Sequence, residues 1–320
     1  MEQRYSKLVK NIILVLAPLL ALMLFTVIFP MSFMSEEYVM WYEQWDYVNW
    51  SKNRPDMLIL GDSRAKSSII PAELDHEGSI YNIGIGGATP IEMYYAVKNH
   101  IKNNGAPKEA VVIFAPYHFC DIDNWDQTLF NNYLSVSEIT EVYERAAKYH
   151  NKTILKKGWF TDELAFRLRL PNKYLAQIYE ARFTRYKERN KARFDSVRGD
   201  LGYCEFGSDP GNDGESYEVH HSEFDSDPMV IFYYDELIGL LVKNGVKVTI
   251  LQTPVNETSS ELITGEFREG YADFLTSIEE KYQGITVYKE IPCYENRYFG
   301  DNNHLNRAGA EKFTRSLGIF

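Results

Sequence analysis

The sequence predicts a three-layer α/β domain in which helices cover both faces of a parallel sheet. From residue 57 onward, short apolar runs alternate with longer segments of helical periodicity. Helical crossovers join parallel strands, so this alternation favours one parallel sheet. The chain has 320 residues, of which 45% are hydrophobic, and this length allows one large domain or two small ones.

The first 30 residues predict a membrane anchor. Asn11–Phe29 is a run of 19 residues without a charge, which is long enough to cross a bilayer. Basic residues precede this run and the acidic pair Glu36–Glu37 follows it. The positive-inside rule therefore places the N-terminus in the cytoplasm and the rest of the chain outside. Residues 28–33 are bulky, which favours an uncleaved transmembrane helix over a secretory signal.

Residues 31–55 are interpreted as a juxtamembrane linker rich in Trp and Tyr. These side chains favour the membrane–water interface. Trp41 and Trp45 also recur at roughly helical spacing. A stalk helix that packs on the domain or on a membrane partner is therefore an equal alternative.

Within the remaining part, residues 56–320, five apolar runs predict strands at Met57–Leu60, Ser79–Ile83, Val111–Ala115, Val246–Gln252 and Ile285–Tyr288. Helical patterns predict helices at Ile91–Lys102, Met229–Lys243, Glu261–Lys281 and Arg307–Leu317. Gly61 ends the first strand in a tight turn. Thr89 is the expected N-cap of the first helix, and Pro90 occupies its first position. Asn244-Gly245 marks the C-terminal end of the next helix.

A long insertion, at about 120–227, separates the third strand from the later helix. Residues 145–200 are expected to be helical and contain 15 Lys or Arg against six acidic residues. This basic segment is either a solvated helix face or a contact for an anionic polymer or lipid headgroup. Residues 200–227 carry nine acidic side chains and no Lys or Arg, which predicts a flexible loop that covers the site as a flap.

Two short motifs supply the groups of a serine-nucleophile site. Ser63 follows the first strand, at the edge where open α/β sheets place reactive groups. Asp301 and His304 are three residues apart, and on a tight turn this spacing lets a carboxylate orient an imidazole. The expected roles are nucleophile for Ser63, base for His304 and orienting group for Asp301. Helix capping is the structural alternative for Ser63 and Asp301, and Asp62 is interpreted as a turn former.

Three motifs in this order resemble the SGNH (GDSL-type) hydrolase superfamily: Gly61-Asp62-Ser63-Arg64, Asn82-Ile83-Gly84-Ile85-Gly86-Gly87 and Asp301-x-x-His304. The resemblance covers residues 56–320 and implies a flavodoxin-like fold. It also implies an oxyanion hole made of backbone N–H groups of Ser63 and of Gly86 or Gly87. Arg64, the long middle segment and the anchor look most like bacterial proteins of alginate acetylation or lipoteichoic-acid D-alanylation.

The sequence departs from the superfamily after the third strand. A Gly-x-Asn-Asp block usually stands there, and its Asn completes the oxyanion hole. Here Pro116-Tyr117-His118-Phe119 takes its place. Tyr117 or His118 is expected to replace the Asn or to contact the substrate, unless backbone N–H groups suffice. Arg64 is expected either to bind an anionic substrate group or to pair with a carboxylate.

The composition limits the partners and cofactors. A net charge of −11 argues against nucleic acid. Cys120, Cys204 and Cys293 lack metal-type spacing and allow at most one disulfide. His220-His221 also lacks the spacing of a metal site, and no metal or organic cofactor is implied.

These observations predict a membrane-anchored, extracytoplasmic acyltransferase or esterase that acts on O-acyl groups of a cell-surface polysaccharide or teichoic-acid-like polymer. The resemblance implies a membrane-bound O-acyltransferase as the partner that delivers the acyl group. Two alternatives stay open: a surface carbohydrate O-acetyl esterase, and a non-catalytic docking subunit.

Overall fold

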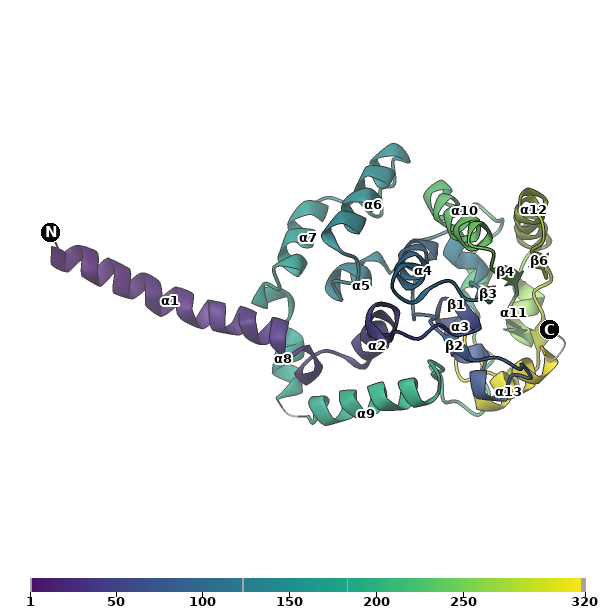
Figure 1. Ribbon diagram of the computed structural model, residues 1–320, viewed down its shortest axis with the longest axis horizontal. Coiled ribbons are helices and arrows are strands. Elements are labelled where there is room, and N and C mark those ends of the chain that lie inside the picture. Colours follow the sequence, from purple (N-terminus) through teal and green to yellow (C-terminus); the bar gives the residue numbers. More distant parts are fainter. Residues whose placement is uncertain (1, 123, 183, 318–320) are drawn as a thin grey trace.

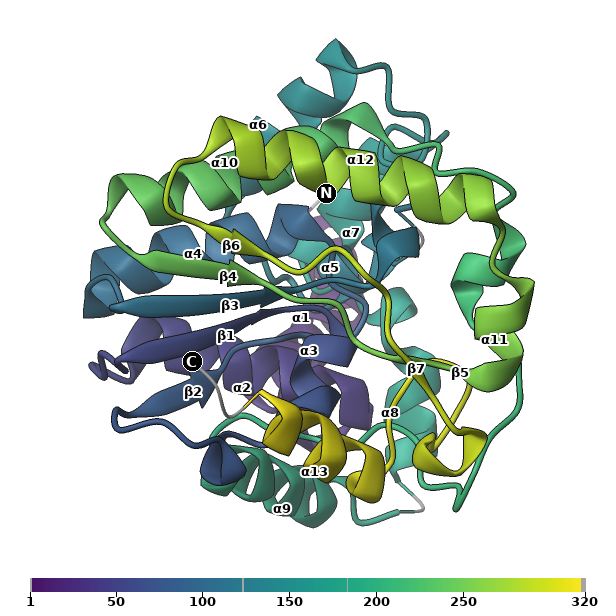
Figure 2. The same cartoon turned by 90° about the vertical axis from the view of Figure 1, so that its right-hand side faces the viewer.

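The computed structural model describes residues 2–122, 124–182 and 184–317. A five-stranded, entirely parallel sheet forms its centre, in the order β2-β1-β3-β4-β6 (Figure 2). Its strands are β1 (Met57–Gly61), β2 (Ile80–Asn82), β3 (Glu109–Ile113), β4 (Lys247–Ile250) and β6 (Thr286–Val287). A second parallel pair, β5 (Val255–Asn256) and β7 (Cys293–Tyr294), was not predicted. The prediction of one central parallel sheet in an α/β domain is confirmed.

Helices cover both faces of this sheet. Leu58 and Leu60 of β1 join the core on one face, whereas Met57 and Ile59 join the core on the other, because alternate side chains of a strand point to opposite faces. The first face is covered by α2 (Glu36–Trp50), α4 (Pro90–Asn104), α10 (Pro228–Lys243) and α12 (Gly265–Lys281). The second is covered by α3 (Ser63–Ser68) and α13 (Arg307–Ser316).

The first part of the insertion is largely helical, as the sequence predicts, whereas residues 200–227 contain a single 3-10 turn. It contains α5 (Trp125–Phe130), α6 (Val136–Lys148), α7 (Trp159–Arg167), α8 (Leu175–Ala181) and α9 (Tyr186–Gly199). One further short helix, α11 (Glu257–Leu262), precedes α12. Single 3-10 turns lie at Pro30–Ser32, Pro71–Glu73, Pro116–Phe119, Pro171–Lys173, Tyr217–His220 and Asn296–Tyr298.

Most observed element boundaries differ from the predicted ones by a few residues, and two of these differences have a clear structural cause. The third strand begins two residues earlier than predicted, because Glu109 pairs with Met57 of β1 and fixes the register. The predicted helix Glu261–Lys281 is divided into α11 and α12, because the Thr264 side chain accepts the N–H of Phe267 and starts a new helix.

The aromatic segment 31–55 packs as part of the domain. Trp41, Tyr47 and Val48 of α2 belong to the main core. Glu43 of α2 is fully buried and accepts a 2.7 Å hydrogen bond from Arg198 of α9. Of the alternatives for this segment, the structure therefore shows a helix packed on its own domain.

The N-terminal helix α1 (Glu2–Ile28) projects away from the domain (Figure 1). Arg4–Ile28 contains a window with a mean hydropathy of 2.6, of which only 6% is buried. The helix is long and apolar enough to cross a membrane, which is consistent with a single-pass anchor.

Candidate active site

Ser63 lies at the point where the strand order reverses. β2 and β3 flank β1 on opposite sides, and open α/β sheets bind ligands at the C-terminal edge of such a switch point. Gly61 ends β1 with φ of 141°, and a Cβ there would lie 1.5 Å from the carbonyl oxygen of Ile113. Only glycine therefore permits the turn that presents Ser63, which is 8% exposed, at the first position of α3.

Ser63, His304 and Asp301 form one hydrogen-bonded chain. His304 Nε2 lies 2.7 Å from Ser63 Oγ, and His304 Nδ1 lies 2.8 Å and 2.9 Å from the two carboxylate oxygens of Asp301. An antiparallel bridge between Phe299 and Leu305 closes the loop that carries both residues. The structure thus brings the three predicted catalytic residues together, although 241 positions separate the serine from the histidine.

Asp301 is held in its ionised form. Burial alone would raise the pKa of its carboxyl group, but the His304 imidazole and the N–H groups of Asn303 and His304 lower this pKa below its usual value. Both N–H groups donate to Oδ1 at 2.8 Å. An ionised Asp301 fixes the His304 tautomer with the proton on Nδ1, which leaves Nε2 free to accept the serine proton.

Asp62 organises the floor of the site. Its Oδ1 accepts the N–H groups of Arg64 and Ala65, and its Oδ2 accepts the Ala115 N–H at 2.6 Å and His118 Nδ1–H at 2.8 Å. This is a larger role than the predicted turn former. His118 is only 1% exposed, so it forms part of the wall, and its predicted contact with substrate finds no support in this position.

Arg64 pairs with a carboxylate, which was one of its two predicted roles. Its Nη2 donates to Glu218 at 2.7 Å and to Asn303 Oδ1 at 3.2 Å, and Arg64 is 2% exposed. Arg64 therefore supports the loop that carries His304. The Tyr117 ring lies beside this pair, 6.0 Å from the guanidinium and 4.9 Å from the Tyr217 ring.

The predicted oxyanion glycines lie beside two side chains from the insertion. Phe206 stacks on His304 with ring centroids 4.8 Å apart, and a Cβ on Gly86 would lie 3.0 Å from the Phe206 ring. Asn124 lies against Gly87, where a Cβ would be 3.0 Å from Asn124 Nδ2. An amide group thus lies next to the glycine loop, although no Asn occupies the position of the Gly-x-Asn-Asp block, which Pro116–Phe119 takes.

The acidic segment 200–227 forms a wall of the site. It supplies Phe206 and the fully buried Glu218, and its backbone at Gly207 closely approaches Gly300. Its position agrees with the predicted flap, but these buried contacts hold it against the loop that carries Asp301 and His304. Spacing along the chain could not reveal Phe206 or Glu218, because their partners His304 and Arg64 are distant in sequence.

Metal-type clusters of three or more His, Cys, Asp or Glu side chains do not occur in the described part of the chain. Cys120, Cys204 and Cys293 are free thiols. No protein-family model and no curated protein matches this sequence.

Proposed function

We propose that the protein is a membrane-anchored serine acyltransferase or esterase of SGNH type. The hydrogen-bonded chain from Ser63 through His304 to Asp301 is the observation that carries this proposal. His304 Nε2 takes the Ser63 proton while Oγ attacks the acyl carbonyl, and it then returns the proton to the leaving alcohol. In the second step His304 activates an acceptor hydroxyl or water, which takes the acyl group and regenerates Ser63.

The strand order of the sheet supports the SGNH proposal. A parallel sheet in the order β2-β1-β3-β4-β6 corresponds to the flavodoxin-like arrangement, with the reactive group at the β1/β3 switch point. The backbone N–H groups of Ser63 and Gly87, together with the Asn124 amide, are our candidates for the oxyanion hole. Asn124 would take the role of the Asn in the superfamily's Gly-x-Asn-Asp block, although Asn124 lies nine residues after Ala115.

Asn124→Ala is expected to lower kcat of ester turnover by roughly 10²- to 10³-fold, because one oxyanion donor is lost. Steady-state kinetics on an aryl ester measures this effect, and KM should change much less. The matched control is Asn244→Ala, at an exposed position that ends α10. Equal kcat in Asn124→Ala and in the wild type would remove Asn124 from the site.

The location and substrate class follow from the anchor and from the sequence resemblance. With the apolar part of α1 across the membrane and the basic residues at the N-terminal end of this helix in the cytoplasm, the catalytic domain lies outside the cell. An acceptor there would be a sugar or polyol hydroxyl of a surface polymer. A membrane-bound O-acyltransferase would supply the acyl group.

The fate of the acyl group tests this function. Full-length protein in detergent would be given p-nitrophenyl acetate with and without a polyol such as ribitol. A transferase yields acetylated ribitol at the expense of acetate, whereas an esterase yields acetate alone. If Ser63→Ala leaves polymer acylation in cells intact, the protein is instead a docking subunit.

A further inference from the structure

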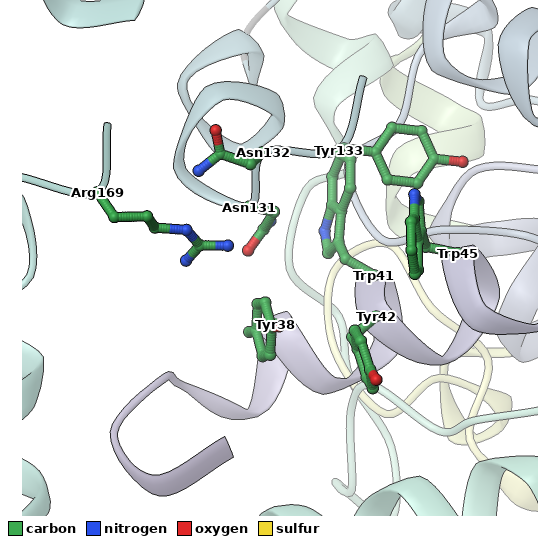
Figure 3. A pocket seen from close by; sticks show the side chains of 8 residues that line it. All are labelled: Tyr38, Trp41, Tyr42, Trp45, Asn131, Asn132, Tyr133 and Arg169. Carbon is green, nitrogen blue, oxygen red and sulfur yellow. The ribbon is translucent and has the colours of Figure 1, made fainter. Parts of the chain in front are cut away.

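A second pocket lies between α2 and the insertion, and it shares no residue with the catalytic site (Figure 3). Its volume is about 150 Å³. Tyr38, Trp41, Tyr42 and Trp45 of α2 line one wall, and Asn131 and Arg169 of the insertion lie opposite. The rings of Tyr38, Tyr42 and Trp45 stack in sequence, with centroids 5.7 Å and 6.3 Å apart. A cavity of this size holds one ring-sized group, so it fits a headgroup and not a polymer.

Arg169 brings an uncompensated positive charge to this pocket. Its Nη1 is buried without a hydrogen-bond acceptor, and no carboxylate in residues 2–122, 124–182 and 184–317 pairs with it. By contrast, Arg167, two residues earlier, pairs with Glu163 at 3.0 Å. Burial raises the pKa of the nearby Tyr38 phenol to about 12, so that phenol is neutral and supplies no counter-charge. A guanidinium with such a buried and unpaired nitrogen favours an anionic ligand.

Asn131 is a second group without a partner. It is 8% exposed, and both its Oδ1 and its Nδ2 are buried without a hydrogen-bond partner among the described residues. Leaving such atoms unsatisfied costs about 1–3 kcal/mol. Figure 3 shows the ends of the Asn131 and Arg169 side chains directed toward the same space. Together they offer donors for an anion and an acceptor for a hydroxyl.

The pocket lies next to the end of the apolar helix. Thr26 of α1 donates a 3.1 Å hydrogen bond to the carbonyl oxygen of Arg169. Phe33, in the link to α2, packs against Tyr174 with ring centroids 6.0 Å apart. Thr26 is two residues from the end of α1. If α1 crosses the membrane, the contact with Thr26 therefore places Arg169 close to the membrane surface. Trp and Tyr side chains favour that headgroup level.

We propose that this pocket binds the phosphate of a small phosphate ester at the membrane surface, with Arg169 on the phosphate and Asn131 on a neighbouring hydroxyl. A guanidinium binds phosphate oxygens through two parallel N–H groups, and the rings of α2 cover the apolar side of the ligand. The same chemistry occurs in a phospholipid headgroup and in a soluble glycerol phosphate. This inference requires α1 to cross the membrane, but it does not depend on the catalytic proposal.

Tryptophan fluorescence of the full-length protein in detergent micelles tests the pocket, because Trp41 and Trp45 line it. The probes are dihexanoyl phosphatidylglycerol, sn-glycerol 3-phosphate and dihexanoylglycerol, which lacks phosphate. A saturable change with the lipid alone identifies a lipid headgroup, and a change with both phosphates identifies a phosphate ester from either source. Arg169→Gln should weaken binding by tenfold or more, since a charge-assisted contact is lost.

Two further variants separate the pocket from general charge attraction. Arg185→Gln removes an exposed Arg outside the pocket and should change affinity by less than twofold. Asn131→Leu should weaken binding several-fold while raising the thermal midpoint, because an unsatisfied buried amide is removed. The proposal would be overturned if neither phosphate showed saturable binding, or if dihexanoylglycerol bound equally well. Equal losses of affinity in Arg169→Gln and Arg185→Gln would also overturn it.

Discussion

Replacing Ser63 with alanine is expected to reduce ester turnover by about 10⁴-fold or more. The hydroxyl that His304 contacts at 2.7 Å is then absent, so no acyl-enzyme can form. His304→Ala should have an effect of similar size, because the serine loses its base. Since the two residues act as one unit, the double variant should be no worse than either single variant. Stopped-flow and steady-state measurements on p-nitrophenyl acetate would provide these rates.

Ser277→Ala is the matched control for the serine replacement. Ser277 is exposed on α12, where its hydroxyl donates to the carbonyl oxygen of Phe274, and turnover should match the wild type. Circular dichroism should show that Ser63→Ala folds normally, because the replacement removes only one hydroxyl group. Turnover retained in Ser63→Ala at more than a tenth of the wild-type rate would contradict the assigned nucleophile.

Asp62→Asn is expected to destabilise the fold by about 3–5 kcal/mol, the usual cost of breaking a buried charged network. The carboxylate accepts four donors, and an asparagine amide would turn its NH₂ group toward some of them. The thermal midpoint should fall by roughly 10 °C for a chain of this size. Turnover should fall as well, because Asp62 caps the helix that begins with Ser63.

The pH dependence of stability distinguishes Asp62 from other acidic residues. Burial alone would raise its pKa, but the hydrogen bond and charge of His118, the Ala115 N–H and Arg64 lower this pKa below the usual value. Its stabilising effect is therefore present above the unfolded-state pKa of about 4 and is lost as the pH falls through the lower folded-state pKa. The difference in thermal midpoint between wild type and Asp62→Asn should shrink below about pH 4. The exposed Asp195→Asn should show no such pattern, and a constant difference for Asp62→Asn would contradict the assignment.

The residues of the proposed triad were predictable because each motif is local. Gly61 and Ser63 mark a strand end, and the spacing of Asp301 and His304 is short enough to act within one loop. The parallel sheet was predictable because its strands are buried on both faces and read as apolar runs. The observed third strand begins two residues before the predicted one, because pairing with β1 sets its register. Phe114 and Ala115 look equally strand-like in the sequence but lie beyond the end of β3.

The support around the triad was not predictable from the sequence. Arg64 meets Glu218 across 154 positions, and nothing in the acidic composition of 200–227 distinguishes Glu218 from its neighbours. The position of Asn124 beside the glycine loop was not predictable, because the turn at Pro116–Phe119 and the residues after it separate Asn124 from the end of the third strand. The sequence does not determine whether α2 is buried, because its aromatic residues suit a membrane surface and a protein core equally well.

Covalent labelling tests the central claim most directly. Full-length protein would be treated with a fluorophosphonate, which reacts with the hydroxyl of an activated serine, and the product would be mapped by mass spectrometry. The Ser63–His304–Asp301 chain predicts one label per molecule, located on Ser63, and its loss in His304→Ala. Absence of label on Ser63, or equal labelling in His304→Ala, would contradict the assignment of a serine-nucleophile site.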